Sequence, residues 1–183
     1  MNIYILRHAS AGLRRPNPIL DRKRPLDKEG KRHCLQLALV LNAMKLQFDV
    51  IVSSPLKRCM QTASLVGTEM GYEAQIVPSA ALAPDATFAQ FQKLLKEFAG
   101  YENVLLVGHN PNLSGFLGSL LIPTTSSADA KGGPAPVRLR KGSMARLNLA
   151  RGPATLQWLI EPRTVRALYA TSTAKSRRKT SRK

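Results

Sequence analysis

Three short polar clusters in the sequence carry residue types that suit phosphate chemistry. Arg7 and His8 follow one apolar segment, residues 53–58 follow a second, and residues 108–111 follow a third. The apolar segments are typical of buried strands. Ligands of open α/β sheets bind outside the carboxyl ends of the strands. We therefore expect the three clusters to meet at one edge of a sheet, although they lie far apart in the chain.

Two histidines and two arginines at one sheet edge fit phosphoryl transfer. A neutral imidazole can attack phosphorus and form a covalent intermediate. The guanidinium groups of Arg7 and Arg58 match phosphate oxygens with paired donors and stabilise the charge of the transition state. Alone, Arg58 would be an ordinary solvated helix residue and His109 part of a capped turn. It is the joint placement of these residues with His8 that favours a phosphate site.

We expect the reaction to need no metal ion and no cofactor. No carboxylate cluster suited to magnesium accompanies the polar clusters, and the sequence has no Gly-x-x-x-x-Gly-Lys-Ser/Thr loop. Cys34 and Cys59 have neither metal-ligand spacing nor the pattern of a disulfide framework. Two unpaired cysteines favour a reducing, cytoplasmic location.

The elements that must position the clusters alternate between strands and helices. This order predicts a single three-layer α/β/α domain with a mostly parallel sheet flanked by helices. With 183 residues, 44% of them apolar, the chain can build one sizeable core. Expected strands span residues 2–6, 49–52, 75–77 and 103–107, with a hairpin of 143–149 and 154–160; expected helices span 27–46, 56–70, 88–98 and 113–121; loops span 10–25 and 122–136.

Local signals support the helix boundaries. Asp27 and Thr87 stand where N-cap residues are expected, and Gly71 can end the preceding helix in a left-handed conformation. The helix after Asp27 carries apolar residues at roughly helical spacing, namely Leu35, Leu39, Met44 and Leu46.

The net charge of +17 is concentrated near the C-terminus. Residues 131–183 carry 14 Lys and Arg against one Glu, whereas residues 1–130 carry 14 against 10 Asp and Glu. The last nine residues, 175–183, include six basic side chains and no apolar one. Such a run cannot bury enough surface to fold, so we expect a domain at 1–170 and a disordered basic tail at 171–183. That tail is either an arm for a polyanion or a solvated extension.

Nothing in the sequence predicts a leader or a membrane anchor. The chain begins with a strand pattern rather than a basic segment followed by a long apolar run. No apolar stretch approaches the roughly 18 residues that a membrane span needs.

The ordered motifs resemble the histidine phosphatase, or phosphoglycerate mutase-like, superfamily. LRHA (6–9) is similar to its Arg-His-Gly signature, SSPLKRCMQTA (53–63) to its second motif, VGHNP (107–111) to the segment of its second histidine, and RPLDKEG (24–30) to a stretch of the short SixA-type phosphohistidine phosphatases. The match runs from about residue 1 to 121, and KGSMARLNL (141–149) continues it less specifically.

The resemblance implies a role for each matching residue. His8 would be the nucleophile, and Arg7, Arg58 and His109 would cradle the phosphoryl group. Arg24 would lie at the rim of the pocket, or else would be a solvated loop arginine.

The sequence departs from the superfamily pattern at two places. Ala9 replaces the usual glycine, and no Glu stands clearly where the superfamily has an acid for the leaving group. Asp85 lies in roughly the right region, but a loop aspartate can equally cap a turn or helix. A site without a dedicated acid suits phosphohistidine, because an imidazole with a pKa of about 6.5 leaves more readily than an alkoxide.

We therefore expect a phosphatase that works through a phosphohistidine at His8, with a phosphohistidine-bearing protein as substrate. Two alternatives remain. One is a small-molecule phosphomonoesterase of the same superfamily. The other is a non-catalytic polyanion-binding protein with a relict pocket, against which the intact Arg7, His8, Arg58 and His109 argue.

Overall fold

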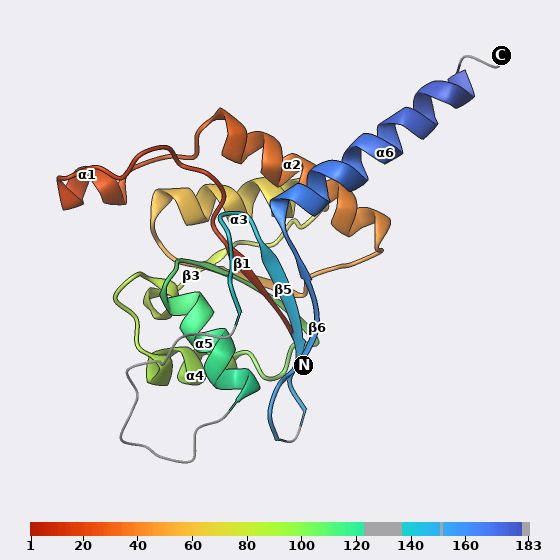
Figure 1. The fold of residues 1–183 in the computed structure, drawn as a ribbon. Coiled ribbons are helices and arrows are strands. Elements are labelled where there is room, and N and C mark those ends of the chain that lie inside the picture. The colour runs from red at the N-terminus through yellow and green to blue at the C-terminus, as the bar shows by residue number, and fades with distance from the viewer. Residues whose placement is uncertain (123–136, 151, 181–183) are drawn as a thin grey trace.

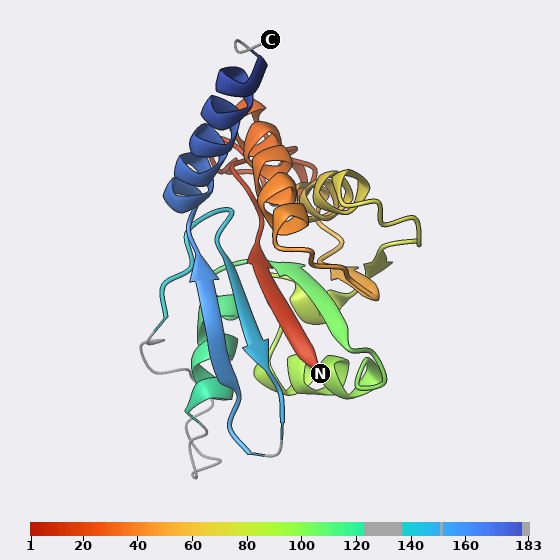
Figure 2. The same ribbon diagram turned by 90° about the vertical axis from the view of Figure 1, so that its right-hand side faces the viewer.

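The computed structural model describes residues 1–122, 137–150 and 152–180, with residues 172–180 described by their backbone alone. Within these ranges six strands form one sheet in the order β3-β2-β4-β1-β5-β6 (Figures 1 and 2). The strands are β1 (Asn2–Arg7), β2 (Val50–Ser53), β3 (Val77–Pro78), β4 (Asn103–Gly108), β5 (Met144–Asn148) and β6 (Thr155–Ile160).

The sheet is parallel from β3 to β1 and antiparallel at the other edge. β1 pairs in parallel with β4, β4 with β2, and β2 with β3, whereas β5 is antiparallel to both β1 and β6. The predicted mostly parallel sheet and the predicted C-terminal hairpin are confirmed.

The register of the central strands decides where the polar clusters lie. Arg7 at the end of β1 is aligned with Gly108 at the end of β4, and Ser53 of β2 is aligned with Val107. His8 continues this pairing, because its N–H donates to the Gly108 carbonyl at 3.1 Å. The three clusters therefore leave the sheet side by side.

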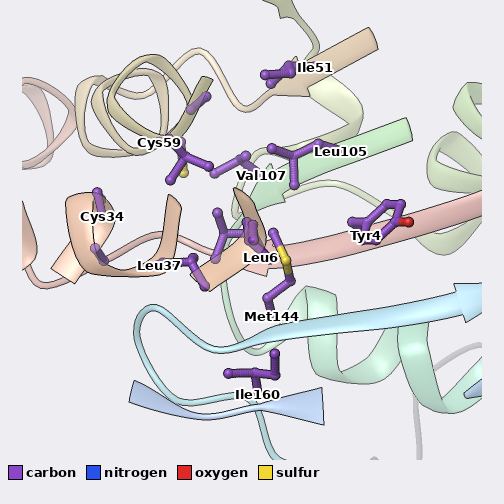
Figure 3. Packing of buried hydrophobic residues seen from close by; sticks show 14 of the residues in the cluster. Tyr4, Leu6, Cys34, Leu37, Ile51, Cys59, Leu105, Val107, Met144 and Ile160 are labelled. Carbon is purple, nitrogen blue, oxygen red and sulfur yellow. The ribbon is translucent and has the colours of Figure 1, made fainter. Parts of the chain in front are cut away.

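Alternating side chains of the strands feed two cores, one on each face of the sheet. Tyr4 and Leu6 belong to the first core, and Ile3 and Ile5 to the second. The first core lies under α2 (Lys28–Ala43), α3 (Lys57–Glu69) and α6 (Pro162–Thr180), the second under α4 (Phe88–Glu97) and α5 (Asn112–Leu121) (Figures 1 and 2). Figure 3 shows side chains of the first core meeting from the sheet and from α2 and α3. This is the predicted three-layer arrangement.

Both predicted N-caps, Asp27 and Thr87, are present. The Asp27 carboxylate accepts a hydrogen bond from the Gly30 N–H, and Thr87 forms a capping box with Gln90. Gly71 follows α3 in a left-handed conformation, with a φ of 74°. The helix boundaries thus follow from local sequence signals.

The apolar spacing read along α2 pointed to the wrong residues. Leu35 and Leu39 are 38% and 49% exposed, and Met44 follows the helix and is 41% exposed. The residues of this helix that are at most 1% exposed are Cys34, Leu37, Ala38 and Leu41. These follow the i, i+3, i+4, i+7 spacing of a single helix face, which Leu35 and Leu39 do not join.

The segment predicted as the loop 10–25 contains a short helix, α1 (Pro18–Arg22). Asn17 caps it, because its side-chain oxygen accepts from the N–H groups of Ile19 and Leu20. No residue of α1 is buried, and the helix stands away from the body of the molecule (Figure 1). A second short element, η1 (Ala80–Leu82), follows β3.

The C-terminal segment also differs from its prediction. α6 continues to Thr180, so most of the segment 171–183 is helical, and residues 181–183 lie outside the described part of the chain. The first half of α6 is fixed by Val165, which is fully buried in the first core. Ala, Lys and Arg have high helix propensities, so a helix that is already anchored can continue through them. The predicted loop 122–136 falls almost entirely outside the described residues.

Candidate active site

A cavity of about 550 Å³ lies at the carboxyl ends of β1, β2 and β4. The structure brings all six candidate site residues to its walls, namely Arg7, His8, Arg24, Arg58, Asp85 and His109. They come from four parts of the fold: the end of β1 with the segment after it, the first turn of α3, the loop after η1, and the end of β4.

His8 is held as a neutral imidazole with one nitrogen free to react. Its Nδ1 lies 2.8 Å from the Ala9 carbonyl oxygen, which can only accept, so Nδ1 carries the proton and Nε2 keeps its lone pair. Burial lowers the pKa of His8 to about 4, and the nearby Arg58 and Arg7 lower it as well. The residue as a whole is only 6% exposed. At neutral pH it can act as a nucleophile without first losing a proton.

His109 faces His8 across the cavity, with ring centroids 5.1 Å apart. Arg58 Nη2 donates toward His109 Nδ1 at 3.4 Å, and His109 Nε2 donates to Ser54 Oγ at 2.9 Å. The thiol sulfur of Cys59 lies 3.2 Å from Nε2. Burial lowers the pKa of His109 to about 3, as do the positive charges around it. Ser54 and Arg58 therefore fix both the orientation and the tautomer of this ring.

Arg7 and Arg58 line the cavity, and each has a guanidinium nitrogen that pairs with no described residue. Arg7 Nη1 donates to the Leu139 carbonyl at 2.9 Å, whereas the buried Nε atoms of Arg7 and Arg58 have no hydrogen-bond partner among the described residues. A buried donor without a partner is costly. Both guanidinium groups line the cavity, so an oxyanion bound there would lie beside two positive charges.

Arg24 lines the cavity and is not a solvated loop residue, because part of its guanidinium group is paired within the protein. It is 9% exposed, its Nη1 donates to the carbonyls of Ala11 and Gly12, and its Nε lies 2.9 Å from a carboxylate oxygen of Asp21. Arg58 Nη1 lies 3.4 Å from the other oxygen of the same carboxylate and 3.0 Å from the Asp21 carbonyl. Asp21 thus ties the two arginines together.

Asp85 lies in an exposed turn at the rim of the cavity. It does not cap α4, since that position belongs to Thr87. The turn is fixed from below by Asn112, whose side-chain amide donates to the carbonyls of Pro84 and Ala86 at 2.9 and 2.8 Å. Asp85 is therefore presented toward the cavity by a braced loop.

Sequence reasoning missed several residues of the site. Asp21, Arg14, Arg15 and Lys141 all line the cavity. Lys141 had a weak signal, because it opens the segment that continues the superfamily resemblance. Arg14 and Arg15 stand in a proline-rich loop whose path the sequence does not specify, and Asp21 was hidden among charged loop residues.

Hydrogen bonds from three directions hold the turn that carries Lys141. The Gly142 N–H donates to the carbonyls of Arg7 and His8 at 3.0 and 3.1 Å, and the Gly142 carbonyl accepts from His33 Nε2 at 2.8 Å. Gly142 has a φ of 79°, and a Cβ there would collide with the His33 ring. His33, buried in α2, thereby holds Gly142, whose N–H in turn holds the backbone carbonyl of His8.

Among the residues that the structure describes, no group of three His, Cys, Asp or Glu side chains is placed to hold a metal ion. In the same part of the chain, none of the helices is both long and apolar enough for a membrane span.

Comparison with known proteins decides the family. A family model of the histidine phosphatase superfamily (branch 1) matches residues 3–83. An uncharacterized protein of Picosynechococcus sp. is 34% identical over 116 residues, which cover 62% of this chain and 68% of that protein. The chain belongs to the histidine phosphatase superfamily.

Within the superfamily, the similarity extends over most of the chain to SixA proteins. The phosphohistidine phosphatase SixA of Escherichia coli is 28% identical over 167 residues, covering 88% of this chain and 94% of that protein. The fold is also similar to that of the protein histidine phosphatase SixA in complex with tungstate, with a TM-score of 0.74. The match covers 88% of this chain and 97% of that chain, at 25% sequence identity. The chain is a SixA-like phosphatase of the superfamily, as the motifs predicted.

The superfamily fold alone does not choose a substrate. A mycobacterial glucosyl-3-phosphoglycerate phosphatase shares the fold, with a TM-score of 0.65 over 85% of this chain and 96% of that chain, at 18% identity. The substrate has to be argued from the side chains of the site.

Proposed function

We propose that the chain hydrolyses phosphohistidine on proteins, through a phosphoryl group carried transiently on Nε2 of His8. The observation that carries this proposal is the hydrogen bond from His8 Nδ1 to the Ala9 carbonyl, which leaves a neutral ring with its Nε2 lone pair available. The guanidinium groups of Arg7 and Arg58, which line the cavity, supply the positive charge beside which phosphoryl oxygens would bind.

The reaction divides into two displacements. First, His8 Nε2 attacks phosphorus and the bond to the substrate's imidazole breaks, its electron pair returning to that imidazole. The substrate ring leaves as a neutral imidazole when its other nitrogen is already protonated. Water then attacks the phosphorus of phospho-His8, the bond to Nε2 breaks, and dihydrogen phosphate leaves with both hydrogens of the water. Arg7 and Arg58 stabilise the equatorial oxygens in both steps.

The carboxylates of the cavity support phosphohistidine over a phosphate ester. Asp21 and Asp85 are the carboxylates that line it among the described residues. Asp21 is committed to Arg24 and Arg58, and its pKa is held below its ordinary value by hydrogen bonds from the Arg15 N–H and Arg24, which outweigh burial. It is thus a poor proton donor. An alkoxide needs such a donor, whereas an imidazole with a pKa of about 6.5 needs it much less.

The surroundings of the cavity support a substrate carried on a protein. Residues 12–20 are exposed throughout, and several of them border the cavity that holds His8. A phosphorylated side chain on a protein surface can approach such a site directly. The SixA relative of Escherichia coli is itself named a phosphohistidine phosphatase.

The test is a comparison of kcat/KM for a phosphohistidine peptide, an aryl phosphate and an alkyl phosphate. We expect the phosphohistidine peptide to be the best substrate and the alkyl phosphate the worst. An alkyl phosphate hydrolysed faster than the peptide would contradict the proposal.

The cavity volume and Asp85 keep a small-molecule phosphomonoesterase as the second candidate. A volume of about 550 Å³ accommodates a small ligand, and the exposed Asp85 is braced at the rim. As a general acid, Asp85 would contribute about 10²–10⁴-fold for basic leaving groups. Asp85→Asn would then spare the aryl phosphate and abolish most alkyl phosphate hydrolysis. We expect instead that Asp85→Asn changes neither ester nor phosphohistidine hydrolysis appreciably.

The third reading, a non-catalytic polyanion-binding protein, depends on the basic C-terminal residues, whose side chains from 172 onward lie outside the described part of the structure. The absence of turnover with every substrate above would favour it.

We also propose that the protein works in the cytoplasm. The two cysteines, Cys34 and Cys59, are free and buried, which fits a reducing compartment.

A further inference from the structure

Two further cavities adjoin the active-site cavity and extend it across the surface. The second, of about 520 Å³, is lined by Arg22, Lys23, Pro55, Leu56 and Lys57 and shares Arg22 and Leu56 with the first. The third, of about 630 Å³, shares Lys57 with the second and is also lined by Lys31, Met60, Leu65 and Ile76. Because neighbouring cavities share lining residues, the three lie in a row from His8 past the end of α1 and the start of α3, and we treat them as one depression.

This depression is strongly basic, and we refer to it as the basic track. Besides Arg7, Arg24 and Arg58, the Lys and Arg residues that line the three cavities are Arg14, Arg15, Arg22, Lys23, Lys31, Lys57 and Lys141. No carboxylate of the described residues lines the second or third cavity. In the first, Asp21 is paired with Arg24 and Arg58, which leaves Asp85 as the one carboxylate there without a cationic partner among the described residues. The track therefore carries an uncompensated positive charge.

Apolar side chains stand beside these charges. Ile19 and Leu20 of α1 are 67% and 50% exposed, and α1, whose Arg22 lines the first two cavities, projects from the body (Figure 1). Met60, Leu65 and Ile76 line the far end. Exposed apolar side chains with a polar rim are typical of protein contact surfaces.

We propose that the basic track docks the acidic surface of the protein that presents its phosphohistidine to His8, an inference that rests on the proposed function. A protein fits better than a nucleic acid, because no Phe, Tyr or Trp of the described residues lines the three cavities to stack bases. The individual exposed charges contribute little. Their sum attracts an acidic partner and raises the association rate by about 10- to 1,000-fold at low ionic strength.

The experiment uses two phosphohistidine peptides of equal length, one flanked by Asp and Glu and the other by Ser and Gln. The full-length enzyme is assayed with both at low and high salt, with the phosphoramidate ion as a small reference substrate. We expect kcat/KM to be about tenfold higher for the acidic peptide at low salt, and this preference to disappear at high salt. Phosphoramidate hydrolysis should keep its rate.

The test variant is Lys31→Glu/Lys57→Glu. Both residues are exposed, neither lines the cavity that holds His8, and each lies in the first turns of a helix, where negative charge is favourable. The matched control is Lys93→Glu/Lys96→Glu, which makes the same charge change on α4, across the sheet. We expect the test variant to lose the preference for the acidic peptide and the control to keep it, with phosphoramidate hydrolysis unchanged in both.

The outcomes separate the two proposals. If the wild type hydrolyses both peptides equally well, or the control variant loses the preference as fully as the test variant, the docking surface is wrong while the proposed function stands. If it hydrolyses phosphoramidate but neither peptide, both proposals fail. A single-stranded oligonucleotide that competes more strongly than the unphosphorylated acidic peptide would overturn the protein partner in favour of nucleic acid.

Discussion

The burial of His8 makes the stability of the protein depend on pH, and the His8→Asn variant isolates that dependence. Burial, with Arg58 and Arg7 nearby, lowers the pKa of the folded-state ring to about 4, whereas the ring titrates at about 6.5 in the unfolded chain. Between these values the unfolded chain binds more protons than the folded one. The free energy of unfolding therefore rises with pH from about 4 to about 6.5 and is lost as the pH falls through this window.

The size of the effect follows from the two pKa values. The free energy of unfolding falls by about 3 kcal/mol over the whole window, because the unfolded ring takes up a proton that the folded ring does not. About 2 kcal/mol of this loss falls between pH 7 and pH 5. Asparagine at position 8 can still donate to the Ala9 carbonyl but does not titrate. His33 and His109 remain in both proteins, so their contributions largely cancel in the comparison.

Urea denaturation of the wild type and of His8→Asn at pH 7 and pH 5 measures the difference. We expect the wild type to lose about 2 kcal/mol more than the variant on acidification, whichever protein is more stable at pH 7. Equal losses in the two proteins would refute the conclusion that His8 is held neutral by its burial. So would a larger loss in the variant.

Three further predictions test the parts around the nucleophile. Asp21→Asn should lower kcat/KM for phosphoramidate about 10- to 100-fold, because Arg58 loses its anchor, and an unchanged value would show that Asp21 does not position it. Activity should survive dialysis against a chelator; a loss that zinc or magnesium restores would contradict a metal-independent reaction. Gly142→Ala should cost about 1–3 kcal/mol more stability in urea than Gly152→Ala, because both glycines have a positive φ but only Gly142 packs against the His33 ring. Equal costs would mean that the ring moves aside.

The parts of the fold that the sequence predicted are those specified by local signals. The apolar runs of β1 and β4 and the caps at Asp27 and Thr87 depend on residues close together in the chain. The positions of Arg7 and His8 at the sheet edge were also predictable from neighbouring residues, because both directly follow a strand. The face of α2 was not predictable in this way, since Leu35 is as apolar as Leu37 and only packing tells them apart.

The residues that support the site could not be predicted from the sequence, because their partners are distant in the chain. Asp21 acts on Arg58, 37 residues away, and His33 acts on Gly142, 109 residues away. A lone aspartate in a charged loop or a lone histidine in a helix has no pattern that would reveal such a contact. These residues become visible only when the sheet has brought the loops together.

The central claim is that the phosphoryl group passes through Nε2 of His8. The most direct test is rapid mixing of the enzyme with a radiolabelled phosphohistidine peptide, quenching in alkaline detergent, and mapping of the label on the chain. The claim predicts a base-stable, acid-labile phosphate on His8 in the wild type, and neither label nor turnover in His8→Asn. Turnover by His8→Asn at the wild-type rate, or label on another residue of the wild type, would contradict it.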